Sequence, residues 1–166
     1  MKENQKITEL FMHYYIIVPF MSFELPLTSD FINKHSWFIE NGGKILFKVG
    51  GFVENKLKSN LQKNKSIILV EKKDFSIYNA WNQSLDFLES LNINKNSYVI
   101  FLGLDDVLKE DYLKKACDIT KNSNKIDFLY GDFQSILGNY HRNFKSKSNP
   151  NIFKKNNFSF DIPHPG

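Results

Sequence analysis

The sequence is poor in the residues that build disulfide frameworks and zinc sites. Cys117 is its only cysteine, which excludes an internal disulfide and a multi-thiolate zinc site and favours a buried structural thiol. The histidines His13, His35, His141 and His164 show no metal-ligand spacing, so the sequence does not indicate zinc catalysis. A single thiol is compatible with a reducing cytoplasm.

Arginine is as scarce as cysteine. Arg142 is the only arginine among 22 Lys and Arg residues, and the lysines are scattered along the chain. Arginine forks read bases and clamp phosphates, whereas scattered lysines are typical of a solvated surface. The net charge of +4 would by itself suggest a nucleic-acid partner, but the scattered lysines and the single arginine weigh against one. Weak, peripheral attraction to an anionic membrane surface is the more plausible consequence of this charge.

Several sequence signals of known chemistry are missing. The chain contains no GxGxxG, P-loop or GxSxG pattern, which disfavours a dinucleotide cofactor, a P-loop NTPase and a nucleophile elbow. The longest apolar run, residues 11–23, is too short to span a bilayer and contains Pro19. With no targeting signal before it, we expect a cytoplasmic protein that meets membranes, if at all, at their inner face.

What the sequence does contain is an alternation of strand and helix patterns. Strands apolar on both faces are typical of a parallel sheet covered by helices on both sides. We therefore expect one α/β domain over residues 1–166, with residues 145–166 as a loop or tail. The expected strands are residues 14–18, 44–49, 66–70, 97–102 and 126–130, and the expected helices are residues 27–40, 53–62, 76–88 and 109–121.

Asp105 and Asp106 stand directly after the strand expected at residues 97–102. Ligands of parallel sheets gather at the carboxyl ends of the strands. Adjacent carboxylates repel each other, and a divalent Mg²⁺ or Mn²⁺ bridging to a diphosphate would relieve that repulsion. The pair is equally compatible with a helix N-cap followed by a first-turn acid, which would need no ligand.

Four segments resemble, in the family's own order, motifs of the bacterial family 2 glycosyltransferases, which have the GT-A fold. The segment DFSIYNAWNQ at 74–83 resembles DxGIYDAxNKG, and YVIFLGLDD at 98–106 resembles YIxFLNSDD, the family's form of the DXD motif. Further along, DFLYGD at 127–132 resembles DxxYGD, and IPHPG at 162–166 resembles the start of the family's IxHxG segment.

The resemblance implies a Rossmann-like GT-A fold and transfer of a sugar from a nucleotide-sugar donor to an acceptor hydroxyl. The acceptor would be a glycan or a lipid-linked molecule, as in surface polysaccharide or lipooligosaccharide synthesis. By the same likeness, Asp105 lies near the ribose and diphosphate of the donor. Asp106 would hold the divalent cation that neutralises the leaving group.

The resemblance also implies a donor pocket. Asp74 and Asn82 would shape it, and Pro19 and Phe20 are what remains of a PTYN-like sequence after the first strand. The residues alone equally allow Asp74 to be a helix cap and Asn82 to pack its helix against a loop. The family's DGGSTDGT sequence is here KVGGFVEN at 48–55, which lacks the aspartate that would contact the base.

On the acceptor side the resemblance implies Asp132 and His164, although Asp132 could equally hold a turn. In the family, the carboxylate assigned as general base follows the IxHxG segment, so we expect the fold and active site to be incomplete at the C-terminus. Two interpretations stay open: part of a glycosyltransferase, or a non-catalytic module that binds only nucleotide-sugar or a partner protein. A receiver-type phosphate switch would need an arrangement of Asp and Lys that the sequence does not show.

Overall fold

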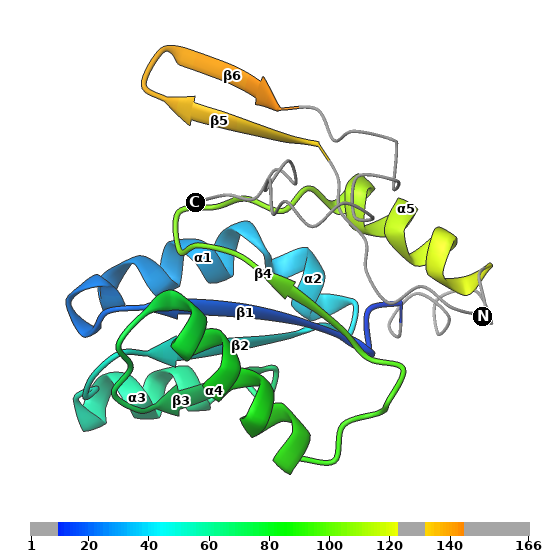
Figure 1. The fold of residues 1–166 in the computed structure, drawn as a ribbon. Coiled ribbons are helices and arrows are strands. Elements are labelled where there is room, and N and C mark those ends of the chain that lie inside the picture. Colours follow the sequence, from blue (N-terminus) through cyan, green and yellow to red (C-terminus); the bar gives the residue numbers. More distant parts are fainter. Residues whose placement is uncertain (1–9, 123–131, 145–166) are drawn as a thin grey trace, which may run out of the picture. The chain divides into compact units, whose positions relative to one another are not determined.

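The computed structural model describes residues 10–122 and 132–144, which belong to two compact units divided after Cys117. The first unit contains a four-stranded sheet with helices on both faces, and the second contains a two-stranded hairpin (Figure 1). Each unit is described by itself.

The four described strands of the first unit pair in parallel, which agrees with the mostly parallel sheet that we expect. Its strands are β1 (Tyr14–Phe20), β2 (Lys44–Val49), β3 (Ile67–Glu71) and β4 (Tyr98–Phe101), in the order β3-β2-β1-β4. This order matches the first four strands of a Rossmann-type sheet and differs from the order of receiver domains, so the topology excludes the receiver alternative. The chain reverses direction across the sheet between β1 and β4, which makes their carboxyl ends the topological switch point.

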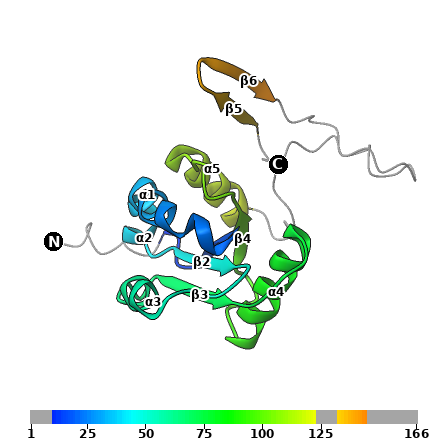
Figure 2. The same cartoon turned by 90° about the vertical axis from the view of Figure 1, so that its left-hand side faces the viewer.

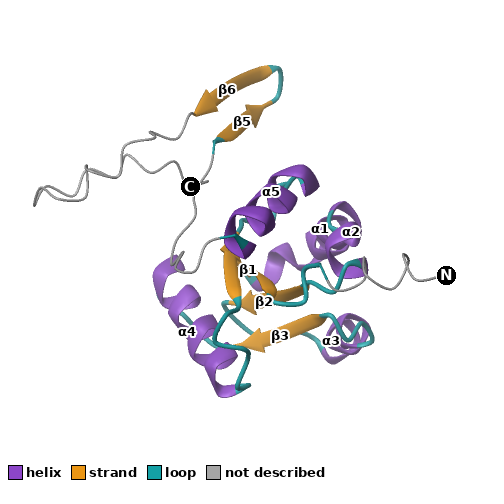
Figure 3. Ribbon diagram, turned by 90° about the vertical axis from the view of Figure 1, so that its right-hand side faces the viewer, coloured by secondary structure: helices purple, strands orange, loops and turns teal. Residues whose placement is uncertain are grey.

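Helices cover both faces of the sheet (Figures 2 and 3), with α4 (Ile77–Ser90) on one face and α1 (Thr28–Lys34), α2 (Ser36–Glu40) and α3 (Asn55–Gln62) on the other. Side chains alternate between the faces along each strand, so Ile16 and Val18 join one apolar cluster while Ile17 and Leu46 join the other. The remaining helices are η1 (Ser22–Leu27, a 3-10 helix) and α5 (Glu110–Lys121). Cys117 of α5 is buried in the first cluster, as expected for a structural thiol.

The single helix expected over residues 27–40 is wrong, because the chain forms α1 and α2 with a break at His35. The carbonyl of Phe31 accepts from both the backbone N–H of His35 and its ring Nδ1, at 3.1 and 2.8 Å. A side chain that competes for backbone acceptors in this way disfavours regular helix. Phe31, His35 and Phe38 nevertheless share one buried face, as their spacing predicts.

Strand β1 continues past Pro19, where the sequence predicted that it would end. Phe20 still pairs with β2, because its carbonyl accepts from Gly50 N–H at 2.9 Å. Main-chain groups alternate in direction along a strand, so the nitrogen of Pro19 faces the β4 side, where pairing already stops at Ile17 and Phe101. The missing N–H of Pro19 therefore removes no bond from the sheet.

Helix α4 is the element that the sequence predicts best. Its N-cap is Ser76, whose Oγ accepts from the backbone N–H of Asn79 at 3.2 Å. Its buried face carries Ala80, Ser84 and Leu88, one helical turn apart. The alternative cap, Asp74, has a different role that is described below.

The second unit contains an antiparallel hairpin that we did not predict. Strands β5 (Phe133–Leu137) and β6 (Tyr140–Phe144) are joined by Gly138 and Asn139, and Gly138 has a positive φ of 57°. A Gly-Asn pair between two strand-forming runs is a recognised hairpin signal. The strand expected at residues 126–130 and the tail at 145–166 lie outside the described residues.

Candidate functional site at the carboxyl edge of the sheet

The loops after β1, β2 and β3 touch one another at the carboxyl edge of the sheet. A Cβ built on Gly50 would lie 2.9 Å from Asp74 Oδ2 and 2.9 Å from Met21 Sδ. A Cβ built on Gly51 would lie 3.3 Å from Ser22 Oγ. The two glycines at the end of β2 therefore let the neighbouring loops approach closely.

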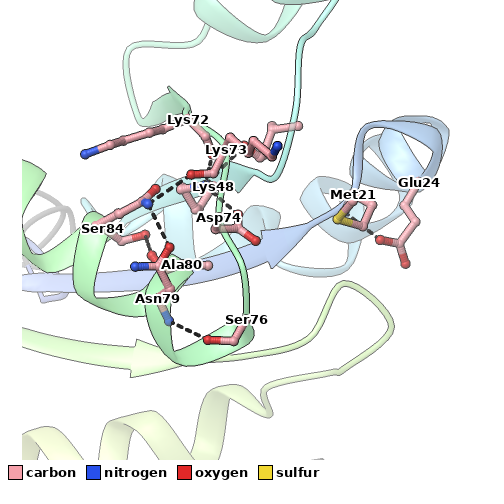
Figure 4. A network of polar contacts seen from close by, with 12 residues as sticks. Met21, Glu24, Lys48, Lys72, Lys73, Asp74, Ser76, Asn79, Ala80 and Ser84 are labelled. Atoms are coloured by element: carbon pink, nitrogen blue, oxygen red, sulfur yellow. Dashed lines mark hydrogen bonds and ion pairs between the residues drawn. The ribbon is translucent and has the colours of Figure 1, made fainter.

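The side chain of Lys48 ties two of these loops together (Figure 4). Lys48 lies on β2 with its side chain fully buried, and its ammonium group donates to Asp74 Oδ2 at 2.8 Å. It also donates to the carbonyls of Val49 at 3.1 Å and Lys72 at 2.5 Å. All three ammonium protons thus have acceptors, which is what permits burial of the charge.

A second ion pair also links β2 and β3, but here the strand residue belongs to β3 and its partner follows β2. Glu71, the last residue of β3, pairs with Lys58 of α3 and accepts from the backbone N–H of Val53 at 3.1 Å. Its pKa is lowered, chiefly by the hydrogen bond from Lys58. The β2–α3 loop is therefore held by a residue of β3, and the β3–α4 loop by a residue of β2.

Asp105 and Asp106 lie in the turn that follows β4. Asp106 Oδ2 accepts from the backbone N–H of Gly103 at 2.6 Å, and its own N–H donates to the carbonyl of Gly103 at 3.2 Å. A Cβ built on Gly103 would lie 3.0 Å from Asp105 Oδ1 and 3.1 Å from Asp106 Oδ2. One point beside the backbone is thus flanked by oxygens of both carboxylates.

The helix-cap interpretation of this pair is wrong. Helix α5 begins only at Glu110, four residues beyond Asp106, so neither aspartate caps it. Asp105 is exposed, whereas Asp106 is half-buried. Burial, the largest cause, and the charge of Asp105 both raise the pKa of Asp106, while the Gly103 hydrogen bond opposes them. The turn therefore holds a carboxylate in surroundings that disfavour its charge.

His35 connects this turn to the helical layer. Its ring is fully buried, its Nδ1 donates to the Phe31 carbonyl, and its Nε2 accepts from the backbone N–H of Leu108 at 3.0 Å. These two bonds together need the neutral ring. Burial is the main cause that lowers the pKa of His35, and it outweighs the nearby charge of Asp106.

The remaining donor-site candidates are spread over the same unit. The side chain of Phe20 is in the core, edge-on to Phe47, and Pro19 is half-buried within β1. Asn82 lies on the exposed face of α4. The contact between helix and loop that we allowed for Asn82 is made instead by Gln83, whose Nε2 donates to the carbonyl of Lys73 at 3.0 Å.

The structure describes neither acceptor-side candidate within this unit. Asp132 is exposed, immediately before β5 in the second unit, and His164 lies outside the described residues. The structure therefore brings together Asp105 with Asp106, and Asp74 with Gly50 and Met21, while the acceptor-side assignments stay predictions.

Lys48 and His35 are the two buried polar side chains that sequence reasoning missed as parts of this edge. A lysine inside the strand sequence KILFKV is a signal in itself, since a strand buried on both faces leaves a charge without solvent. Its partner, 26 residues away, could not be read from local spacing. The role of His35 carried no local signal, because its partner Leu108 is 73 residues away.

The two carboxylates of Asp105 and Asp106 belong to the ligand type that divalent cations prefer. Mg²⁺ and Mn²⁺ prefer carboxylate oxygens, and Mg²⁺ in particular keeps several waters or phosphate oxygens. Within residues 10–122 and 132–144, no group of three or more His, Cys, Asp or Glu side chains is placed to hold a metal ion. The two carboxylates alone would therefore hold a cation weakly.

Comparison with models of protein families, with curated proteins and with solved structures found no match to this chain. Within the part of the chain that the structure describes, no helix is long and apolar enough to cross a membrane. The functional argument therefore rests on the residues and contacts at the carboxyl edge.

Proposed function

We propose that the first unit is a GT-A-like domain that binds a nucleotide-sugar at the carboxyl edge of its sheet, as part of a glycosyltransferase. The observation that carries this proposal is the pair Asp105 and Asp106, whose carboxylate oxygens flank one point beside Gly103. The pair follows β4, which borders the topological switch point, where sheets of this kind bind their ligands.

In this proposal the cation and the diphosphate bind together. A divalent cation held by Asp105 and Asp106 would complete its coordination with phosphate oxygens and water. When bound, it would supply Lewis-acid stabilisation of the nucleoside diphosphate leaving group. Each ligand should then raise the affinity of the other by the same factor.

Gly103 allows both carboxylates to lie close to its backbone, because a side chain there would meet oxygens of both. It has no side chain, and the 2.6 Å hydrogen bond from its N–H holds Asp106 Oδ2 in place. The bond from Leu108 N–H to His35 secures the loop a few residues further on. These contacts preorganise the turn, which lowers the entropic cost of ligand binding.

Asp74 is a candidate for orienting the donor's nucleoside. Lys48 holds one of its oxygens, and the side chain is 13% exposed. The segment KVGGFVEN at 48–55, at the end of β2, lacks the aspartate with which the resembled family contacts the base. We therefore expect weak discrimination between bases, which titrations with UDP, dTDP and GDP would measure.

A second candidate function is donor binding without transfer. Transfer to a hydroxyl needs a base to accept its proton. Glu71 and Asp74, both near the end of β3, are engaged in ion pairs and are therefore poor candidates for this role. Mass spectrometry of reactions with labelled nucleotide-sugars and acceptor panels separates the two: a glycosylated acceptor supports transfer, whereas metal-dependent binding without product supports the non-catalytic module.

A further inference from the structure

Three phenylalanine side chains are exposed to an unusual degree. Phe23, Phe52 and Phe75 have 78%, 77% and 85% of their surface accessible. Aromatic side chains are normally used for burial, and exposed apolar groups that lie together mark interaction surfaces. Each of these residues lies in a connection that follows a different strand, namely β1, β2 and β3.

The backbone places these phenylalanines at one edge. Ser22, the neighbour of Phe23, approaches Gly51, the neighbour of Phe52. Gly50 in turn approaches Asp74, which precedes Phe75. Because the adjoining residues touch and all three rings are exposed, the rings project from neighbouring loops at the carboxyl edge.

The β3–α4 loop adds positive charge to this edge. Lys72 and Lys73 are both exposed, and the ammonium of Lys73 lies 5.8 Å from the centroid of the Phe75 ring. The one acid of the loop, Asp74, is turned inward onto Lys48. The outward side of the loop therefore carries two lysines and an aromatic ring, with the intervening acid neutralised.

We infer that Phe23, Phe52, Phe75, Lys72 and Lys73 form a surface that binds the interface of an anionic membrane. Aromatic side chains enter the headgroup region, while lysines above it are attracted to anionic lipids. Protein–protein interfaces are depleted in lysine, which favours a bilayer over a protein as the occupant. The inference does not require the edge to bind a nucleotide-sugar.

The test is co-sedimentation of the whole chain with vesicles of phosphatidylcholine alone or mixed with phosphatidylglycerol. We expect binding to the mixed vesicles only, falling as salt is raised. Lys72→Gln with Lys73→Gln should weaken it about fivefold for each lysine. Phe52→Ala with Phe75→Ala should also weaken binding to the mixed vesicles. Glu54→Gln removes an exposed acid of the β2–α3 loop and should strengthen this binding.

The matched control is Leu91→Ala with Lys95→Gln. Both residues are exposed and lie in the connection from α4 to the start of β4, at the amino edge of the parallel sheet, so their replacement should leave vesicle binding unchanged. Circular dichroism establishes that each variant is folded. The inference is overturned if the wild-type chain does not sediment with anionic vesicles, or if the edge variants sediment as it does. A wild-type chain that binds anionic vesicles but no nucleotide would count against the proposed function alone.

Discussion

Lys48 and Asp74 form an ion pair of 2.8 Å between a strand and a loop that the sequence separates by 26 residues. The lysine is wholly buried, and its other two protons bind the carbonyls of Val49 and Lys72. The pair holds the β3–α4 loop against the end of β2, so both the donor-site candidate Asp74 and the exposed face of that loop depend on it.

Asp74→Ala should destabilise the first unit strongly. It leaves the buried ammonium of Lys48 without its charged partner, a change that costs about 3–5 kcal/mol in buried pairs. Replacing both partners, with Lys48→Met and Asp74→Ala, should recover much of that loss because no charge is left buried. Urea denaturation of the single and double variants measures the coupling between the two positions.

The control for this prediction is Lys34→Met. Lys34 pairs with Asp30 at 2.7 Å, but both side chains are substantially exposed, so its loss should hardly change the free energy of unfolding. Equal effects of Asp74→Ala and Lys34→Met would contradict the buried role of Lys48.

The buried His35 should make stability depend on pH. Its folded pKa lies below the ordinary value of 6.5, so the unfolded chain binds a proton there before the folded chain does. The free energy of unfolding should therefore fall as pH drops from 6.5 toward the folded pKa, by up to about 1.4 kcal/mol per pH unit. His35→Gln, which retains an acceptor for Leu108 N–H, should flatten this dependence. An unchanged slope in the variant would assign the effect to another group.

Asp106→Asn should stabilise the folded chain and abolish the metal-dependent nucleotide binding that we propose for it. The pKa of Asp106 is raised in the folded chain, so folding disfavours the ionised carboxylate. The stability that the protonated carboxyl group contributes is therefore lost as pH rises through the folded pKa. The amide can still accept from Gly103 N–H, as the carboxylate does at 2.6 Å. Urea denaturation should show a gain at pH 7 that shrinks toward a pH of about 4.

The same variant should bind neither Mn²⁺ nor UDP in the linked manner proposed above. Loss of linked binding together with a gain in stability would identify a residue retained for ligand binding at the expense of stability. A variant that is less stable at pH 7 would show instead that the charge of Asp106 contributes to the fold.

Gly103→Ala should weaken metal-dependent nucleotide binding although it leaves every carboxylate in place. The added methyl would lie about 3 Å from oxygens of both Asp105 and Asp106 and would displace at least one of them. Calorimetric titration measures the affinity, with Gly51→Ala as the matched control because its methyl would meet only Ser22. Equal affinity in the two variants would contradict the role proposed for the carboxylates beside Gly103.

Local patterns were enough to predict much of the fold. The apolar runs of β1 to β4 and the stripe of α4, capped by Ser76, depend on neighbours within a few residues, and the structure confirms them. The break at His35 was not predicted, because helical periodicity continues through it while a side-chain bond to Phe31 competes. The Gly138 hairpin carried a local signal that our sequence reasoning did not use.

The site was predicted less completely than the fold. The strand-end position of Asp105 and Asp106 followed from the order of elements, but their turn geometry beside Gly103 did not. The assignment of Asp74 as a helix cap failed because its partner, Lys48, lies on another strand. Contacts between strand ends are set by the sheet order, which spacing along one sequence does not contain.

The central claim is that a cation and a nucleoside diphosphate bind together at Asp105 and Asp106. Calorimetric titration of the whole chain with UDP, in the presence and absence of Mn²⁺, tests it most directly. We predict weak binding of either ligand alone and a clear gain when both are present, with the same gain whichever is added first. UDP affinity that is unchanged by Mn²⁺, or absent under both conditions, would contradict the claim.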